Sequence, residues 1–215
     1  MEYARPKEHR PEPGKPVLLF DLFGVIARHQ LEEDKRRLQG LGQADSAAFW
    51  SAYWEHRTPY DRGQPAEVYW RRVGQALGRD YSATRIDELV EADVDSWSRI
   101  DEGMVDYLHR LDGDGYRLAL LSNIPHELAE RYESRQDWLG LFALRGFSCR
   151  MGCAKPDPAA YRWCWESLGC RAAEVLFIDD REVNVAAAEA LGMAGHAFGG
   201  LAGLREFLSP DTPAG

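Results

Sequence analysis

Six polar residues have the types and positions needed for phosphoryl chemistry. Each lies at or soon after the end of a short predicted strand, and together they are Asp21, Ser122, Asn123, Lys155, Asp179 and Asp180. A carboxylate can act as a nucleophile on phosphorus or carbon and form a covalent intermediate. Two further carboxylates can hold a hard cation such as Mg²⁺, which prefers oxygen ligands. A lysine and a hydroxyl can bind phosphoryl oxygens, so this set predicts metal-assisted phosphoryl transfer.

The elements that position these residues alternate between strands and helices. Apolar runs predict strands at 16–21, 117–122, 143–149, 175–179 and 193–198. Helical patterns separate the later strands, at 125–135, 157–169 and 182–191. Continuous apolar strands separated by helices indicate a parallel sheet covered on both faces. The predicted fold class is therefore α/β, with a doubly wound parallel sheet whose carboxyl strand ends meet at one edge.

Nothing between the first and second predicted strands has a strand pattern. Helical segments fill this part of the chain instead, at about 31–41, 46–56, 65–77, 82–98 and 102–111. We interpret residues 30–100 as an inserted helical bundle, and 102–111 as the crossover helix into the sheet. The core then comprises 16–29 and 101–210, with a disordered polar arm at 1–15 and a flexible tail at 211–215.

The insertion is rich in aromatic residues, namely Trp50, Tyr53, Trp54, Tyr69, Trp70 and Trp97. A ligand-binding aromatic cage is one interpretation, but the i,i+4 spacing of Trp50 and Trp54 favours packing inside the bundle. The stretch TPYDRG at 58–63 contains Pro, Asp and Gly and predicts a loop. We expect Tyr60, Asp61 and Arg62 of this loop to contribute to specificity, with Arg62 as a candidate substrate-binding residue.

Composition excludes several classes of protein. The chain has 215 residues, 45% of them hydrophobic, which suits one domain with an insertion. The net charge of −9, without a block of Lys and Arg, argues against a nucleic-acid partner. Neither a membrane-spanning run nor a signal peptide is recognisable, so we expect a cytoplasmic protein without a membrane partner, as a monomer or homodimer. The spacing of Cys149, Cys153, Cys164 and Cys170 favours free thiols over a zinc site.

Four motifs resemble those of the haloacid dehalogenase superfamily: FDLFGV, LLSN, CAKPDPAAY and VLFIDDREVNVAAAEALGM. The resemblance covers about residues 16–199, and the helical insertion resembles the superfamily's cap domain. The motifs are most similar to those of bacterial sugar-phosphate phosphatases and of the N-terminal phosphatase domain of soluble epoxide hydrolases. The resemblance implies a Rossmann-like core and a Mg²⁺-dependent phosphatase. Its substrate would be a small phosphorylated metabolite, such as a sugar phosphate, hydrolysed through an aspartyl-phosphate intermediate.

The resemblance also implies a set of metal ligands. Asp21 matches the nucleophile, whose carboxylate would bind Mg²⁺ together with the main-chain carbonyl of Phe23. Asp180 matches the remaining protein ligand, and Asp179 would act beside it or through water. Asn184 matches a position that would order the acidic loop.

Phosphate-binding positions follow from the same motifs. Ser122, Asn123 and Lys155 match them, and Lys155 would also offset the negative charge near Asp21. Gly24 opens the turn after the first strand, where backbone N–H groups can cradle phosphoryl oxygens.

Phe23 departs from the phosphatase pattern, which usually has a second Asp at this position as general acid and base. Such a group typically contributes 10²–10⁴-fold to the rate. Either another side chain replaces it, with His29, His56 and Tyr60 as candidates, or the leaving group needs no proton.

A dehalogenase offers a third explanation, because the superfamily's 2-haloacid dehalogenases also carry an aromatic residue at this position. Arg28 could then bind substrate. The pair Asp179–Asp180 argues against this alternative, because paired carboxylates without a cation repel each other. A binding or regulatory module with little turnover is the remaining alternative.

Overall fold

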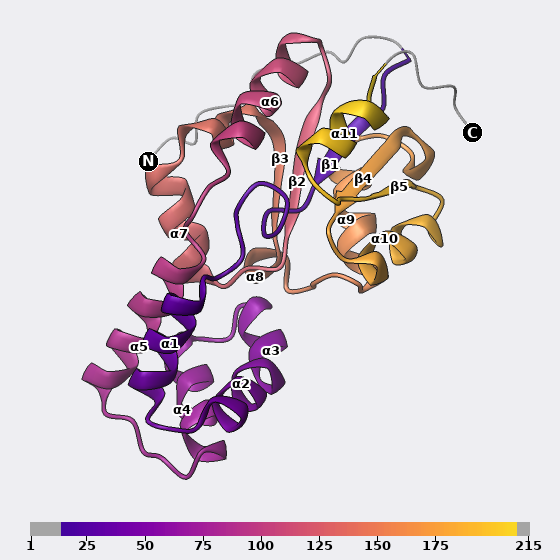
Figure 1. The fold of residues 1–215 in the computed structure, drawn as a ribbon. Helices are drawn as coiled ribbons and strands as arrows, with labels where there is room; N and C mark the ends of the chain where they lie inside the picture. Colours follow the sequence, from indigo (N-terminus) through magenta and orange to yellow (C-terminus); the bar gives the residue numbers. More distant parts are fainter. Residues whose placement is uncertain (1–13, 210–215) are drawn as a thin grey trace.

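The computed structural model describes residues 14–209, so residues 1–13 of the predicted arm at 1–15 and the predicted tail at 211–215 lie outside the described residues. Within this range five strands form one parallel sheet in the order β3-β2-β1-β4-β5 (Figure 1). They are β1 (Val17–Phe20), β2 (Leu118–Ser122), β3 (Phe142–Phe147), β4 (Val175–Asp179) and β5 (Ala194–Ala197). The α/β fold with a parallel sheet is confirmed. Successive strands are added on one side of β1 up to β3 and then on the other side from β4, so the strand order reverses between β1 and β4. Such folds bind ligands at this position.

Helices cover both faces of the sheet because alternate strand residues point to opposite sides. Leu18 and Phe20 of β1 pack in one apolar cluster with α6 (Glu102–Gly113), α7 (His126–Arg135) and α11 (Leu201–Phe207). Val17 and Leu19 pack in the other with α9 (Pro158–Leu168) and α10 (Glu182–Glu189). Shorter helices complete this part, namely α8 (Ser148–Met151) and the 3-10 helices η1 (Asp137–Leu141) and η2 (Ala172–Glu174).

A group of helices, the insertion, follows β1. It consists of α1 (Glu32–Gly42), α2 (Ser46–Glu55), α3 (Arg57–Asp61), α4 (Ala66–Ala76) and α5 (Ala83–Ser96). These helices enclose their own apolar cluster, which includes Phe49, Tyr53, Trp70 and Leu89. Figure 1 shows them grouped apart from the sheet, on the side of α8, which follows the carboxyl end of β3. The domain boundaries at 30 and 100 stay predictions.

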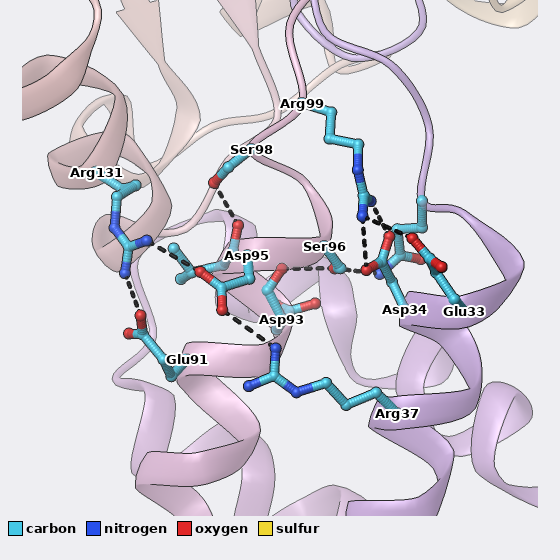
Figure 2. A network of polar contacts seen from close by, with 12 residues as sticks. Glu33, Asp34, Arg37, Glu91, Asp93, Asp95, Ser96, Ser98, Arg99 and Arg131 are labelled. Atoms are coloured by element: carbon cyan, nitrogen blue, oxygen red, sulfur yellow. Dashed lines mark hydrogen bonds and ion pairs between the residues drawn. The ribbon is translucent and has the colours of Figure 1, made fainter.

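Ion pairs join the insertion to the rest of the chain (Figure 2). Arg131 of α7 donates to Glu91 at 2.6 Å and to Asp95 at 3.1 Å, both on α5. Arg99, which follows α5, donates to Asp34 on α1. These contacts join the first turn of α1 and the C-terminal half of α5 to the segment after α5 and to α7.

Several local predictions are wrong. Residues 57–61 form α3 instead of the predicted loop, and β3 ends at Phe147, so Ser148 and Cys149 begin α8. Trp54 does not fill the interior of the bundle, because its side chain is 52% exposed. The buried face of α2 is instead formed by Phe49, Ala52 and Tyr53.

Other predictions agree with the structure. The four cysteines are unpaired, as expected for free thiols. Within residues 14–209, no helix combines the length and apolar character needed to cross a membrane.

Candidate active site

Two neighbouring strands end in acidic residues. Asp21 follows β1 and donates its backbone N–H to Ile178 of β4 at 2.8 Å, while Asp179 ends β4 and Asp180 follows it. One ligand oxygen from each of Asp21, Asp179 and Asp180 lies within 4.8 Å of the others. Parallel pairing of β1 with β4 therefore brings these carboxylates together, as predicted from their positions at strand ends.

Lys155 balances part of this charge. Its Nζ lies 2.7 Å from Asp21 Oδ1 and 2.7 Å from Asp179 Oδ2, with a side chain only 2% exposed. Asn123 fixes the backbone of Lys155 from the end of β2: its Nδ2 donates to the lysine carbonyl at 2.8 Å, and its Oδ1 accepts from the lysine N–H at 2.8 Å. The side chain of Asn123 therefore positions Lys155.

The electrostatics of the cluster leave it short of positive charge. Burial raises the pKa of Asp21 to about 7, although nearby Lys155 lowers it and Asp179 raises it further. Burial alone would lower the pKa of Lys155, but the carboxylates of Asp21 and Asp179 outweigh that effect and raise it. One ammonium cannot neutralise the three carboxylates of this cluster, so their oxygens are suited to a hard divalent cation.

Two buried polar atoms of residues predicted for the site have no hydrogen-bond partner among the described residues, Ser122 Oγ and Asn184 Oδ1. Asn184 Nδ2 donates to both carboxylate oxygens of Asp179 at 3.0 Å. Buried polar atoms are normally paired, and an exception is often completed by water, an ion or a ligand. The unpaired atoms therefore fit a site that binds a metal and an anion.

The turn after β1 approaches the acidic loop closely. Gly24 has φ +83°, and a Cβ at this position would lie 2.3 Å from Asp180 Oδ2. Its own N–H donates to Ala27 O at 2.6 Å, so a phosphate cradle in this turn would have to use other N–H groups. Gly24 instead permits close contact between the turn and Asp180. His29 Nε2 also reaches Asp180 Oδ2, at 3.0 Å.

A cavity of about 400 Å³ opens over the cluster. Its lining residues are Asp21, Phe23, His29, Trp54, Arg57, Asp61, Trp97, Asn123, Lys155, Asp180, Arg181 and Asn184. The insertion contributes Trp54, Arg57 and Asp61, and Trp97 follows α5 directly. The cavity therefore lies between the insertion and the carboxyl ends of the strands.

Several candidates from the sequence lie elsewhere. The lining residues in the described part of the chain do not include Arg62, which pairs with Asp157 at 3.6 Å. The Tyr60 hydroxyl donates to Glu127 at 2.9 Å. His56 is also absent from the described cavity lining, so His29 is the lining residue among the three predicted proton donors. Arg28 contacts Asp101 at 3.4 Å and does not line the described cavity.

Residues 16–192 match the haloacid dehalogenase-like hydrolase family. The chain belongs to this family. It is 35% identical over 184 residues to a sesquiterpene phosphatase of Aspergillus oryzae, covering 82% of this chain and 86% of that protein. It is also 35% identical over 186 residues to a phosphoglycolate phosphatase of Cereibacter sphaeroides, covering 83% of this chain and 82% of that protein.

Solved structures of the family share the fold. A family enzyme from Bacteroides thetaiotaomicron, bt-2542, superposes with a TM-score of 0.77 at 22% identity, covering 91% of this chain and 100% of that one. A further structure of bt-2542 holds magnesium and inorganic phosphate, with a TM-score of 0.68 at 21% identity and coverage of 85% and 93%. At this level of identity, the likeness establishes the haloacid dehalogenase-like fold.

Arg57 lines the cavity but was not among the residues predicted for the site. The Arg57 Nε donates to Asp61 at 2.8 Å and Nη1 donates to Asp93 at 2.9 Å. Asp93 also accepts from the Tyr53 hydroxyl at 2.6 Å. Burial raises the pKa of Asp61, although the guanidinium opposes this shift. The i,i+4 spacing of Arg57 and Asp61 was the available signal, but it carries this meaning only when 57–61 is helical.

Proposed function

We propose that the protein is a Mg²⁺-dependent phosphatase that hydrolyses a small phosphorylated metabolite through an aspartyl-phosphate on Asp21. The observation that carries this proposal is the cluster of Asp21, Asp179 and Asp180, whose oxygens lie within 4.8 Å while Lys155 bonds to two of them. The two relatives named as phosphatases support the reaction class. The magnesium and phosphate bound by bt-2542 support the cofactor.

In this proposal Mg²⁺ is held by the carboxylates of Asp21 and Asp180 and the carbonyl of Phe23, with Asp179 acting indirectly. The cation would supply positive charge beside the phosphoryl oxygens and favour the ionised form of Asp21. The unpaired Asn184 Oδ1 is compatible with a bound ion at this place, whereas Ser122, which was predicted to bind phosphate, is fully buried and is not among the described cavity-lining residues. Arg62 is not included, because it pairs with Asp157 outside the described cavity lining.

Asp21 is oriented for attack by its own neighbours. Its Oδ1 accepts from the backbone N–H of Leu22 at 2.6 Å and lies 2.7 Å from Lys155 Nζ. A carboxylate oxygen of Asp21 attacks phosphorus, and the bond from phosphorus to the leaving-group oxygen breaks. Water then attacks the phosphorus of the aspartyl-phosphate, which releases inorganic phosphate and regenerates Asp21. Lys155 keeps the carboxylate in place, and Asn123 keeps Lys155 in place.

The test is release of inorganic phosphate from phenyl phosphate by the purified protein. We expect turnover that requires Mg²⁺ and is lost in Asp21→Asn, with unchanged circular dichroism. Equal turnover by wild type and Asp21→Asn, or equal turnover after chelation of metal, would contradict the proposal. Absence of turnover on all phosphate esters would favour the binding-module alternative.

Phe23 is the observation that favours the dehalogenase alternative. A halide ion leaves without a proton, so a dehalogenase needs no acidic residue at this position. Its test is halide release from 2-chloropropionate in the absence of metal, which the phosphatase proposal expects to be negligible. Arg28, the residue considered for substrate binding in that alternative, contacts Asp101 and is not among the described cavity-lining residues. A cytoplasmic location and a monomeric or homodimeric state remain predictions.

A further inference from the structure

Aromatic side chains from three separate segments form one surface of the cavity. Phe23 lies in the turn after β1, Trp54 lies in α2, and Trp97 is the C-cap of α5. The ring centroids of Phe23 and Trp97 are 5.1 Å apart, and those of Trp54 and Trp97 are 6.4 Å apart, both with edge-to-face geometry. All three residues line the cavity. We call this surface the aromatic wall (Phe23, Trp54 and Trp97).

The aromatic wall is held in place from behind. The Trp97 Nε1 donates to the Tyr53 hydroxyl at 3.1 Å, and the Trp54 ring lies 4.8 Å from the Tyr53 ring. The ring centroids of Phe23 and Tyr132 are 6.1 Å apart. Trp54 is nevertheless 52% exposed. When an apolar ligand covers a large, fixed and exposed aromatic ring, water leaves both surfaces and the free energy of binding becomes more favourable.

Charge beside the aromatic wall disfavours an anionic ligand tail. Arg57 is the cation that the described insertion helices bring to the cavity, and its guanidinium is bonded to Asp61 and Asp93. Asp61 lines the cavity with Arg57, whereas Asp93 is 1% exposed and is not among the described lining residues. Because the Arg57 guanidinium is already paired with these two carboxylates, it offers no unpaired charge to a carboxylate or second phosphate of a substrate. We therefore expect an uncharged group in the part of the substrate that contacts the insertion.

Phe23 adds a chemical requirement, because it cannot protonate a leaving oxygen, and the Nε2 of His29, the candidate donor in the cavity lining, lies 3.0 Å from Asp180 Oδ2 instead. An alcohol whose anion is stable can leave without that help. A phenol ionises near pH 10, as tyrosine does, whereas water ionises near 15.7. An aromatic alcohol therefore meets the chemical requirement of Phe23 and the packing requirement of the aromatic wall together.

We infer that the substrate is a phosphate monoester of an uncharged, planar aromatic alcohol, and that the aromatic wall binds the aromatic ring. This inference rests on the proposed phosphatase function and names the substrate class of that same site. It distinguishes the chain from an enzyme for phosphoglycolate, whose carboxylate would lie beside Asp61 where the insertion lines the cavity.

The test compares kcat and KM for 2-naphthyl phosphate, acetyl phosphate and phosphoglycolate. Acetyl phosphate has a good leaving group but no ring, so it separates leaving-group chemistry from ring binding. We expect wild type to have the lowest KM for 2-naphthyl phosphate. Trp54→Ala is expected to reduce the preference for 2-naphthyl phosphate over acetyl phosphate by about tenfold, mainly through KM. Val68→Ala, an exposed apolar position of the insertion outside the described cavity lining, is the matched control and should keep the preference.

Two outcomes would overturn the inference: equal effects of Trp54→Ala on 2-naphthyl phosphate and acetyl phosphate, or a wild-type preference for phosphoglycolate. Calorimetric titration of Asp21→Asn in Mg²⁺ separates this failure from failure of the phosphatase proposal. Binding of 2-naphthyl phosphate about tenfold tighter than inorganic phosphate, lost in the double variant with Trp54→Ala, would support the aromatic wall even without turnover. Hydrolysis of acetyl phosphate without such a binding difference would leave the phosphatase proposal standing and reject the aromatic substrate.

Discussion

Replacement of Lys155 by methionine tests the charge balance of the acidic cluster. The ammonium lies 2.7 Å from both Asp21 Oδ1 and Asp179 Oδ2, and the lysine side chain is 2% exposed. Removing one partner of a buried ion pair costs about 3–5 kcal/mol, because the remaining charge stays buried. In a domain of this size each kcal/mol changes Tm by about 2–4 °C, so Lys155→Met is expected to lower Tm of the metal-free protein by about 6–20 °C.

The loss should depend on pH in a defined direction. Without the ammonium, burial and mutual repulsion raise the folded-state pKa values of the clustered carboxyls above their unfolded value of about 3.9. The folded variant then binds more protons than the unfolded chain, so its stability falls as pH rises through the folded-state pKa. The difference in Tm between Lys155→Met and wild type is therefore expected to be larger at about pH 8 than at about pH 5.5.

Differential scanning calorimetry with EDTA and with saturating Mg²⁺ provides the assay. Because the cation supplies the charge that the variant lacks, Mg²⁺ should raise Tm more in Lys155→Met than in wild type. Lys35→Met is the control, since Lys35 is exposed and pairs only with the neighbouring surface residue Glu32 among the described ion pairs. A loss of Tm that is independent of pH and unchanged by Mg²⁺ would refute the charge-balance explanation and indicate lost packing instead.

Three further predictions concern the metal, the turn and the proton donor. Because burial raises the pKa of Asp21 to about 7 and a ligating carboxylate must be ionised, the affinity for Mg²⁺ measured by calorimetry should increase between about pH 6 and 8, and Asp21→Asn should lack this dependence. Gly24→Ala places a Cβ 2.3 Å from Asp180 Oδ2 and should weaken Mg²⁺ binding about 10–100-fold, whereas Gly78→Ala, with no described atom within 4 Å, should not. Phe23→Asp should raise kcat for alkyl phosphates relative to aryl phosphates, by up to about 10²-fold if the new carboxyl reaches the leaving oxygen. An equal fall of kcat for both classes of substrate would show that the packing of Phe23 matters more.

The sheet and the acidic cluster were predictable because they depend on patterns that are local in the sequence. The runs around Leu18, Leu120 and Phe177 are continuous and apolar, which is typical of strands buried on both faces. Parallel strands place their carboxyl ends at one edge, so the positions of Asp21 and Asp179 at strand ends were enough to bring them together. The resemblance to the family supplied the roles, whereas the sheet geometry supplied the proximity.

The cavity wall contributed by the insertion was not predictable in the same way. The i,i+4 pair Trp50 and Trp54 indicates a shared stripe of α2, but it does not say whether that stripe faces the bundle or a cavity. The neighbouring stripe with Phe49 and Tyr53 is also apolar, and it is the one that is buried. In 58–63, Pro59, Asp61 and Gly63 predicted a loop. The helix that forms instead at 57–61 is stabilised by contacts of Arg57 with Asp61 and the distant Asp93.

Phe23 connects these two parts of the molecule. An acidic residue at this position would add a fourth carboxylate close to Asp21, Asp179 and Asp180. The ammonium of Lys155 already has to balance the charge of these three carboxylates. The phenyl ring instead contacts Trp97 of the insertion and Tyr132 of α7. The turn that carries the candidate nucleophile is thereby packed directly against the segment where the insertion rejoins the core. The position that would transfer a proton in a typical relative instead contributes apolar surface to the cavity, so the chemistry of the leaving group and the shape of its binding surface depend on the same residue.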